Sequence, residues 1–332
     1  MSGPILVFVE LGTGDAAGEA DRISLETLAF ARSLAGGLGG APVEALLVGP
    51  GAPAAAAGLG AHGVGGAHVV SDPAVGDAYA PAAWGSSLAS LATSLGAVAV
   101  MGPGTDRGSE VLAHAAARLS MPLAANVLAA TPGPSWSITR QRWAGSLLED
   151  ATLDAPIRCL TVAPHAVPVD DRAGSPAAAV TTFAPQVSAA DLAVHVSGHE
   201  APASGSISLA DAKVVVGGGR GVGSAAAFSE LEELAGLLGA AVGVSRAVTS
   251  NGWRPHTEQV GQTGMRIAPD LYIVCGISGA IQHIVGCKAA KRILAINTDA
   301  ESPIMSVADY AVIGDLHQVV PAVSAEIRRR RG

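Results

Sequence analysis

Short apolar runs alternate with longer mixed stretches along most of the chain. The first four runs are rich in Val, Leu and Ala, and they occupy residues 5–10, 43–49, 67–72 and 97–103. Such runs are typical of strands buried on both faces of a parallel sheet, and the stretches between them have the length of helices. Two of these helices are expected near 79–95 and 108–119. The alternation predicts an α/β fold with parallel strands joined by right-handed crossovers.

This rhythm changes between about residues 121 and 168. The segments SWSITRQRWAG and IRCLTVAP show no intervening helical stretch, so we expect strands that close one edge of the sheet. Residues 169–210 are rich in Ala, Pro, Ser and Gly, which indicates a connection with one or two short strands. We place a domain boundary near residue 205, with an N-terminal α/β domain over 1–205 and a second domain over 206–332.

A second series of five apolar runs occupies residues 213–217, 240–245, 271–276, 292–297 and 310–315. Parallel pairing would bring the carboxyl ends of these strands to one edge, which is where open α/β sheets bind ligands. Small or hydrogen-bonding residues end or follow every run, namely Gly217, Gly218, Gly219, Arg220, Ser245, Arg246, Gly276, Ser278, Gly279, Asn297 and Asp315. The pattern therefore predicts a binding site along this edge.

Two glycine-rich turns at this edge favour a phosphate ligand. GGGRGVGS and GISGA each lead from a strand toward a helix, where backbone N–H groups and the helix dipole attract anions. Together with Arg220 and Arg246 they indicate a pyrophosphate, and Asn297 and Asp315 could then bind ribose or adenine. The first turn does not match a GxGxxG motif followed by an acid about 20 residues later, which disfavours ordinary NAD binding. The expected ligand is a dinucleotide.

His283 and Gln282 allow two interpretations when only the residues are considered. The histidine is either a ligand contact or an imidazole in a core helix, and a glutamine in this place is a surface residue in most proteins. No Ser–His–Asp order and no paired acids mark the edge for hydrolysis or proton transfer. The polar segment TEQVGQTGMRIAP is too irregular for a simple crossover helix. From the residues alone, the redox-active part of the expected dinucleotide is not identified.

Composition narrows the class of protein. The chain has 332 residues, enough for two domains, and is 49% hydrophobic but only 3% aromatic. Its formal net charge of -8 argues against nucleic-acid binding, which needs a basic face. Three cysteines without a CxxC pair argue against a zinc site and a disulfide framework. Because there is no basic leader and no apolar run of membrane-spanning length, we expect a soluble, cytoplasmic protein without metal or membrane insertion.

Several segments resemble one protein family. The similarity to the C-terminal FAD domain of the electron transfer flavoprotein alpha subunit is dense from about 213 to 322. It runs through VGGGRGVGS, GAAVGVSRAVTSNGW, QVGQTGMRIAPDLYIVCGISGAIQHIVG, AINTD and SPIMSVADYAVIGDL. The segment GISGAIQH is the most specific part of this match. The N-terminal half is similar more loosely, in ILVFVE, ALLVG and VAVMGPGTDRGSEVLAHAAARL.

This resemblance implies a doubly wound, DHS-like second domain that binds FAD without a covalent bond. It further implies a heterodimer with a beta subunit, which the N-terminal domain would contact, with LGTGDAAGEADR as a mobile surface loop. Such a complex is an electron carrier rather than an enzyme with its own substrate. It takes electrons one at a time from flavin dehydrogenases, such as the acyl-CoA dehydrogenases of fatty acid β-oxidation, and passes them to a membrane quinone oxidoreductase.

The resemblance also implies which residues contact FAD. In this sequence they are Arg220, Ser245, Arg246, Val260, Gly261, Gln262, Thr263, Ser278, Gly279, Ala280, Ile281, Gln282, His283, Asn297 and Asp315. The Arg246 guanidinium would stack on the flavin, Thr263 would lie near N5, and His283 would lie near the N1/C2 carbonyl. These three would tune the flavin, with Arg246, and His283 if it is protonated, raising the first reduction potential. Ser278 to His283 would cover the pyrophosphate turn and this histidine, and Asn297 and Asp315 would lie on the adenosine side.

Some positions depart from the family pattern, and two other functions stay open. The family often has a lysine where this chain has Val222 and Gly223, and Trp143 and Ser146 depart from an Arg–x–Tyr–Ala–Gly–Asn-like run. We interpret Arg142 and Trp143 as structural or interfacial. One alternative is an NAD(P)- or thiamine-linked oxidoreductase, for which no catalytic acid, base or second cofactor site is visible. The other is a flavin-free paralogue that acts as an assembly partner.

Overall fold

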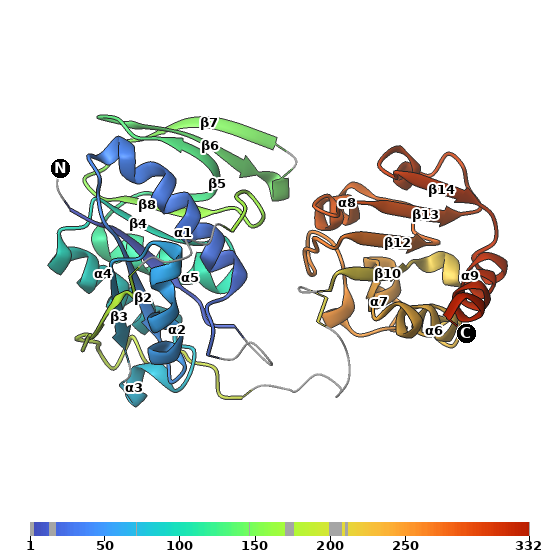
Figure 1. The fold of residues 1–332 in the computed structure, drawn as a ribbon, viewed down its shortest axis with the longest axis horizontal. Coiled ribbons are helices and arrows are strands. Elements are labelled where there is room, and N and C mark those ends of the chain that lie inside the picture. Colours follow the sequence, from blue (N-terminus) through green and yellow to red (C-terminus); the bar gives the residue numbers. More distant parts are fainter. Residues whose placement is uncertain are drawn as a thin grey trace. The chain divides into compact units, whose positions relative to one another are not determined.

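The chain folds into two units, each with its own sheet (Figure 1). The computed structural model describes residues 3–12, 18–70, 72–145, 147–169, 176–198, 208–209 and 212–331. The units comprise Met1–His199 and Glu200–Gly332. The prediction of two α/β domains is confirmed, while the boundary predicted near residue 205 lies outside the described residues. The loop predicted over 11–22 is described only at its two ends, where Leu11 and Ala20 form an antiparallel bridge.

The first unit follows the predicted order of strands and helices. Its strands are β1 (Ile5–Val9), β2 (Val43–Val48), β3 (Gly66–Val70), β4 (Ala99–Pro103), β5 (Leu123–Thr131), β6 (Trp136–Arg142), β7 (Leu147–Leu153), β8 (Arg158–Val162) and β9 (Ala179–Thr182). Its α-helices are α1 (Arg22–Ala35), α2 (Ala52–Gly58), α3 (Pro73–Gly76), α4 (Pro81–Leu95) and α5 (Asp106–Leu119). The helices expected near 79–95 and 108–119 correspond to α4 and α5.

The described strands of this unit form one sheet in the order β7-β6-β5-β8-β4-β1-β2-β3-β9. In this order, every neighbouring pair from β5 to β9 at the far edge is parallel. Strands β6 and β7 extend the opposite edge as antiparallel neighbours of β5 and of each other. The predicted change of rhythm after residue 121 is therefore confirmed as the edge of the sheet. The connection after residue 169 contributes one described strand, β9, which extends the other edge beside β3.

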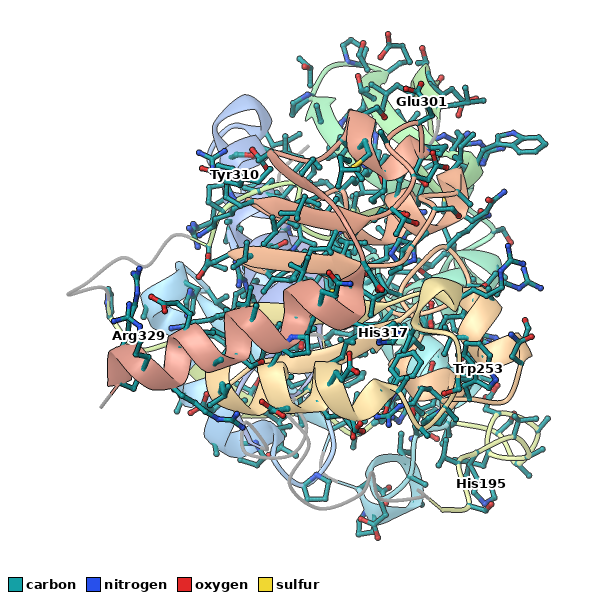
Figure 2. The ribbon with its side chains drawn as sticks, turned by 90° about the vertical axis from the view of Figure 1, so that its right-hand side faces the viewer. His195, Trp253, Glu301, Tyr310, His317 and Arg329 are labelled. Carbon is teal, nitrogen blue, oxygen red and sulfur yellow. The ribbon has the colours of Figure 1, made fainter. Side chains whose placement is uncertain are left out.

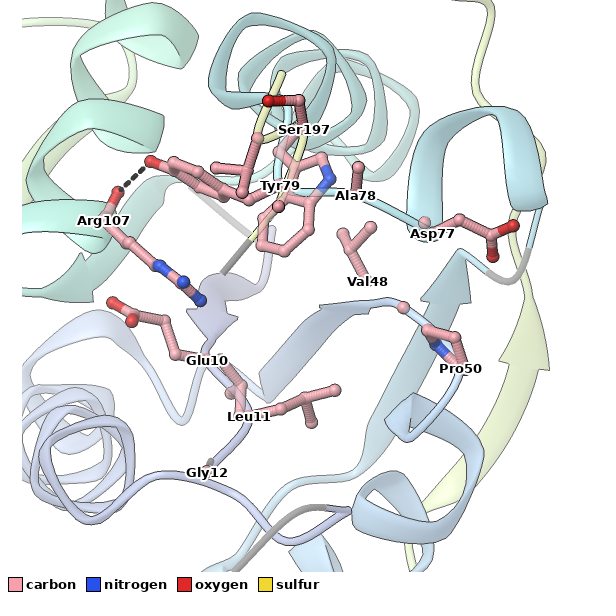
Figure 3. A pocket seen from close by; sticks show the side chains of 16 residues that line it. Glu10, Leu11, Gly12, Val48, Pro50, Asp77, Ala78, Tyr79, Arg107 and Ser197 are labelled. Carbon is pink, nitrogen blue, oxygen red and sulfur yellow. Dashed lines mark hydrogen bonds between the residues drawn. The ribbon is translucent and has the colours of Figure 1, made fainter. Parts of the chain in front are cut away.

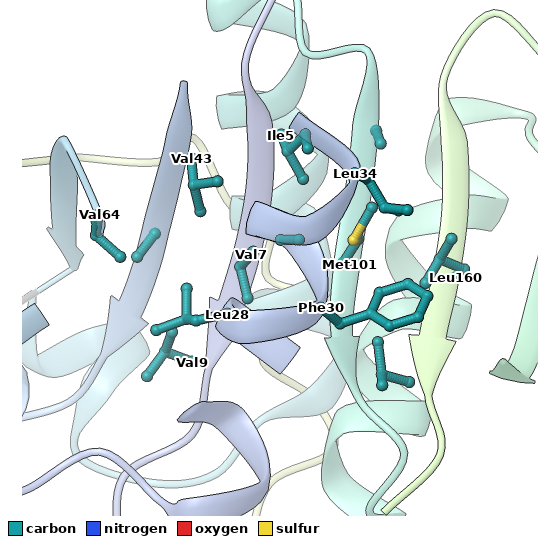
Figure 4. Close-up of a cluster of buried hydrophobic side chains, with 14 of the residues drawn as sticks. Ile5, Val7, Val9, Leu28, Phe30, Leu34, Val43, Val64, Met101 and Leu160 are labelled. Atoms are coloured by element: carbon teal, nitrogen blue, oxygen red, sulfur yellow. The ribbon is translucent and has the colours of Figure 1, made fainter. Parts of the chain in front are cut away.

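The central strands of the first sheet, β1, β4 and β8, are buried on both faces, which explains their continuous apolar sequences. Ile5, Val7 and Val9 of β1 face a core that includes Leu28 and Phe30 of α1 (Figure 4). The alternate β1 residues, Leu6 and Phe8, pack instead into a core with side chains from α4 and α5. Because successive side chains of a strand point to opposite faces, a strand between two helical layers must be apolar at every position.

The second unit is a smaller parallel sheet with helices on both faces. Its strands are β10 (Val214–Gly218), β11 (Ala241–Val244), β12 (Leu271–Cys275), β13 (Ile293–Asn297) and β14 (Tyr310–Ile313). Its α-helices are α6 (Phe228–Leu238), α7 (Arg246–Ser250), α8 (Ile281–Cys287) and α9 (Leu316–Arg331). All five strands predicted from the sequence are present within one or two residues of their expected ends, and every pair is parallel.

Strand order in this unit creates a crevice between β10 and β12. The order is β11-β10-β12-β13-β14, so the chain leaves β10 toward β11 and then crosses to the opposite side of β10 to form β12. Connections on either side of such a point diverge, which opens a binding crevice at the carboxyl ends of the two strands. Both glycine-rich turns of the sequence follow these two strands.

No helix in the described ranges combines the length and apolar character that crossing a bilayer requires. Cys159, Cys275 and Cys287 are buried, unpaired thiols.

Candidate functional site

Backbone hydrogen bonds join four strand ends into one continuous edge in the second unit. The Ser245 N–H donates to the Gly218 carbonyl at 3.0 Å, and the Gly219 N–H donates to the Cys275 carbonyl at 2.9 Å. The Gly276 N–H in turn donates to the Ile296 carbonyl at 2.9 Å. The residues after β11, β10, β12 and β13 therefore follow one another along this edge, as the sequence predicted for parallel strands.

The two glycine-rich turns touch each other across the crevice. A Cβ atom on Gly219 would lie 2.1 Å from the Gly276 carbonyl oxygen, and one on Gly221 would lie 2.8 Å from the Gly276 Cα atom. Gly276 itself has a φ of 62°, a left-handed conformation that favours glycine. The glycines are therefore required where turn packs on turn. A side chain at any of these three positions would separate the strands that form the crevice.

Polar side chains remain exposed around this crevice. Arg220 lies in the short 3-10 helix that follows β10, and Arg246 begins α7 directly after β11. Both guanidinium groups are exposed, and neither has an ion-pair partner among the residues that the structure describes. Ser278 and Gln282 are exposed as well, after β12 and in the first turn of α8. Two cations that lack an ion-pair partner in the described ranges form a setting that favours a phosphate-bearing ligand.

The segment 260–263 is held against helix α8 by its backbone. The Gln262 N–H donates to the Gln282 carbonyl at 2.7 Å. A Cβ atom on Gly286 would lie 2.4 Å from the Cα atom of Gly261, so these two glycines allow the loop and the helix to meet. Thr263 is exposed at the end of this segment. The 260–263 loop and the α8 residues predicted from the sequence as FAD contacts are therefore neighbours in space.

His283 lies in the core rather than among the exposed groups. Its side chain is 6% exposed, and its Nε2 atom lies 2.9 Å from the Tyr272 hydroxyl. Burial lowers the pKa of His283 to about 4, opposed only by the nearby backbone of Val260. Burial also raises the pKa of Tyr272, so its hydroxyl keeps its proton and donates to Nε2. With this lowered pKa, His283 favours the neutral imidazole near pH 7, with its proton on Nδ1 and Nε2 accepting from Tyr272.

The buried Nδ1 atom of His283 makes no hydrogen bond of good geometry with a described residue, although the Val260 backbone is near enough to oppose the lowering of the His283 pKa. Unpartnered polar atoms in a core are uncommon, because their desolvation is not repaid by a new hydrogen bond. A bound group that accepts from Nδ1 would remove this cost.

Asn297 and Asp315 already serve the fold. The Asn297 amide nitrogen donates to the Ile277 carbonyl at 3.1 Å, and its oxygen accepts from the Asp299 N–H at 3.1 Å. Asp315 accepts from the His317 N–H at 2.9 Å in the first turn of α9. The polar ends of these strands therefore have a structural role that the sequence interpretation did not foresee.

Two residues of this site were missed in the sequence. Gln259 and Tyr272 are buried and hydrogen-bonded to Thr263 and His283, respectively. Gln259 carries no local signal, since a glutamine in a polar loop is ordinarily a surface residue. Tyr272 reads as one more apolar strand position.

A second hollow lies in the first unit, at the carboxyl ends of β1 and β2 (Figure 3). It has a volume of about 340 Å³, and its walls include Glu10, Pro50, Tyr79, Trp84, Arg107 and Ser197. The Arg107 guanidinium lies 5.0 Å from the centre of the Tyr79 ring, and the Thr105 hydroxyl donates to Glu10. Burial raises the pKa of the Glu10 carboxyl. This hollow was not predicted from the sequence.

Comparison with known proteins matches the two units to two different family models. The family model of the electron transfer flavoprotein FAD-binding domain matches residues 208–288, which contain both glycine turns, Arg246 and the 260–263 segment. The model of the electron transfer flavoprotein domain matches residues 6–188, more than half of the chain.

The chain belongs to the electron transfer flavoprotein alpha subunit family.

Relatives from distant bacteria agree with this assignment. The electron transfer flavoprotein subunit alpha of Mycobacterium tuberculosis (strain H37Rv) is 37% identical over 99% of this chain and 99% of its own. The same subunit of Syntrophomonas wolfei is 33% identical over 97% of this chain and 98% of its own. The Paracoccus denitrificans subunit reaches 54% identity over 119 residues, 36% of this chain and 39% of its own.

The second unit is thus the FAD-binding domain of an electron transfer flavoprotein alpha subunit, and its donors fit that cofactor. The exposed guanidinium of Arg220 suits a pyrophosphate, that of Arg246 suits a ring that gains negative charge, and exposed hydroxyl and amide groups suit a polar ring edge and a ribityl chain. The Nδ1 atom of His283, which makes no well-formed hydrogen bond to the described residues, is a further donor. The hollow in the first unit lies outside the residues that the FAD-binding model matches.

Proposed function

We propose that this chain is the FAD-carrying subunit of a heterodimeric electron transfer flavoprotein. It would accept electrons one at a time from flavin dehydrogenases, such as acyl-CoA dehydrogenases, and deliver them to a membrane quinone oxidoreductase. It would act as a carrier without a substrate of its own. The observation that supports this proposal most strongly is the pair of exposed arginines, Arg220 and Arg246, which have no ion-pair partner in the part of the chain that the structure describes and lie beside the crevice of the domain that binds FAD in this family.

Different residues around the crevice would contact different parts of FAD. We propose that Arg220 and the 278–283 segment bind the pyrophosphate, with Ser278, Gly279, Ala280, Ile281 and Gln282 contributing backbone or side-chain contacts. Ser245 and Arg246, together with Val260, Gly261, Gln262 and Thr263, would surround the flavin ring. Asn297 and Asp315 would contribute the hydrogen-bonding capacity that the fold leaves them on the adenosine side.

FAD supplies the redox chemistry when bound, and the protein sets how readily it is reduced. We propose that Arg246 supplies positive charge beside the ring, which favours a flavin that has gained negative charge. His283 would contribute a neutral hydrogen-bond donor, because burial lowers its pKa to about 4. His283 would then donate in the same way across the neutral pH range.

We propose that the first unit binds the beta subunit. Its β6–β7 hairpin carries a group of exposed apolar side chains at its tip, namely Trp143, Leu147 and Leu148. Trp143 is 80% exposed in a left-handed conformation with a φ of 50°. An exposed tryptophan is a frequent anchor of protein interfaces, which supports the interfacial interpretation of this residue. We further propose a cytoplasmic location, where three unpaired thiols suit a reducing compartment.

Co-expression with a beta subunit tests the proposal directly. The purified complex should contain both chains and about one FAD per heterodimer, visible as oxidised flavin bands in its absorbance spectrum. Addition of a reduced acyl-CoA dehydrogenase should bleach these bands. A colourless heterodimer that takes up no added FAD would point to the flavin-free paralogue, and bleaching by NADH alone would point to a nicotinamide-linked oxidoreductase.

A further inference from the structure

Gln259 is a buried polar residue at the base of the loop that carries Thr263. Its side chain is 2% exposed. Its backbone N–H donates to the His256 carbonyl at 2.9 Å, and its carbonyl accepts from the Met265 N–H at 2.6 Å. Gln259 also forms a parallel bridge with Val244, the last residue of β11. The backbone of Gln259 is therefore held against the sheet, which fixes the position from which its side chain extends.

Both ends of the Gln259 amide are hydrogen-bonded to threonine hydroxyls. The Nε2 atom lies 3.0 Å from Thr263 Oγ1, and the Oε1 atom lies 2.6 Å from Thr249 Oγ1. Thr249 belongs to helix α7, which Arg246 begins, and its hydroxyl also lies 3.0 Å from the Arg246 carbonyl oxygen. The amide thus connects the Thr263 loop to the helix that presents Arg246.

The two distances favour one orientation of the amide. Thr249 has a single hydroxyl proton, and Gln259 Oε1 at 2.6 Å is a nearer acceptor for it than the Arg246 carbonyl oxygen at 3.0 Å. Hydrogen bonds between two oxygens are typically 2.7–2.8 Å long, and those from nitrogen to oxygen are typically 2.9–3.0 Å. The 2.6 Å separation therefore suits the amide oxygen as acceptor from Thr249, and the 3.0 Å separation suits the amide nitrogen as donor to Thr263. The reverse orientation would put the longer type of bond at the shorter distance.

This orientation has a consequence for the Thr263 hydroxyl. The Thr263 oxygen accepts from Gln259, so the Thr263 proton takes no part in the hydrogen bonds among Thr249, Gln259 and Thr263. Thr263 is exposed on the same segment that packs on α8. Its proton is therefore free to be donated toward a ligand in the crevice.

We propose that Gln259 is a positioning residue that makes Thr263 a hydrogen-bond donor to the flavin ring. The relay Thr249–Gln259–Thr263 sets the direction in which the Thr263 hydroxyl donates. This inference rests on the proposed binding of FAD in this crevice. The donated bond strengthens when the ring becomes more negative, so the relay raises the first one-electron reduction potential.

Three variants of the FAD-loaded heterodimer test the relay. Gln259→Met removes both amide bonds at similar side-chain length. Gln259→Glu presents only acceptors, which draws the Thr263 proton inward. Thr263→Val removes the hydroxyl itself, and Thr263→Ser is the matched control because it keeps a hydroxyl at the same position. The readouts are bound FAD per heterodimer, its dissociation constant, and the first one-electron potential from a spectroelectrochemical titration.

We expect Gln259→Met and Thr263→Val to bind FAD and to shift the first potential in the negative direction. The shift should correspond to about a three- to tenfold change in the relative affinity for the reduced and oxidised cofactor, as for one neutral hydrogen bond. In the Thr263→Val background, Gln259→Met should cause no further shift, because the relay then has no hydroxyl to orient. Gln259→Glu measured in the same background isolates the effect of its added charge.

The outcomes separate the relay from the proposed function. Additive shifts of Gln259→Met and Thr263→Val, or an unchanged potential in Gln259→Met, would overturn the relay while FAD binding stands. A parent heterodimer without FAD would overturn the proposed function itself. If Gln259→Met does not fold, Thr249→Val removes the opposite hydrogen bond and leaves Gln259 in place. That variant should shift the potential in the same direction, whereas no shift would refute the relay.

Discussion

Gly261 and Gly286 meet backbone to backbone, so that a Cβ atom on Gly286 would lie 2.4 Å from the Cα atom of Gly261. This contact holds the 260–263 loop against helix α8. It joins the two segments that we propose to surround the flavin ring and the pyrophosphate.

The first prediction concerns this contact. Gly286→Ala should force the loop away from α8, because backbone atoms cannot yield as a flexible side chain can. We expect a loss of about 1–3 kcal/mol in the free energy of unfolding of the second unit, as for overpacking in a core, and weaker FAD binding. Amide hydrogen exchange of β12 and an FAD titration measure the two effects.

Gly236→Ala is the matched control for this substitution. Gly236 lies inside helix α6, and a Cβ atom there would have no neighbour within 4 Å. Alanine should stabilise that helix by up to about 1 kcal/mol and leave FAD binding unchanged. Equal effects of the two substitutions would contradict the role of the glycine contact.

The second prediction concerns the charge beside the ring. A unit charge about 4 Å from a site that gains negative charge changes its energy by about 4 kcal/mol at an effective dielectric of about 20. Solvent reduces this effect at an exposed position, so Arg246→Ala should lower the first one-electron potential by on the order of 100 mV. Spectroelectrochemical titration of the heterodimer measures the shift, and Arg246→Lys should restore part of it.

Arg329→Ala is the control for removal of a positive charge. Figure 2 shows Arg329 and His317 toward opposite ends of helix α9, and twelve residues of helix separate them by about 18 Å. Because α9 begins at the carboxyl edge of the sheet, Arg329 lies far from the crevice and beyond the screening length. A potential that changes equally in both variants would show that Arg246 acts only through net charge.

The third prediction concerns pH. The pKa of His283 is lowered by burial from 6.5 to about 4, so the unfolded chain binds a proton more readily than the folded one between these values. The stability that depends on a neutral His283 is complete above pH 6.5 and is lost as the pH falls toward 4. Between pH 7.5 and 5.0 the loss from this residue should be about 2 kcal/mol.

Hydrogen exchange of the second unit at the two pH values measures this loss. His283→Gln keeps a polar group near Tyr272 without a titrating ring, and its stability should depend less on pH by the same amount. An identical pH dependence in the parent and the variant would show that His283 is charged or exposed in solution.

The fourth prediction concerns the β6–β7 hairpin. Trp143→Ala should weaken binding of the beta subunit by about 2 kcal/mol or more, as expected for a buried tryptophan anchor. The stability of the isolated chain should change little, because the side chain is 80% exposed before binding. Val194→Ala, at a side chain that is 69% exposed in the same unit, is the control. Calorimetric titration with the beta subunit distinguishes the two, and equal affinities would exclude the tip from the interface.

The sequence was sufficient to predict the elements and their directions. Strands such as β1 and β12 are buried on both faces, so they appear as unbroken apolar runs, and helical lengths between them require parallel pairing. Parallel direction alone places the residues after every strand on one edge. For this reason Arg220, Arg246 and Ser278 could be assigned to one site without coordinates.

Tertiary structure alone decided how these elements contact one another. The insertion of β8 between β4 and β5, the placement of β9 beside β3, and the contact of Gly219 with Gly276 join residues far apart in the chain. Local patterns carry no record of such pairings. The neutral state of His283 and the buried amide of Gln259 likewise depend on neighbours from other segments, because desolvation and hydrogen bonding are properties of the packed environment rather than of the residue.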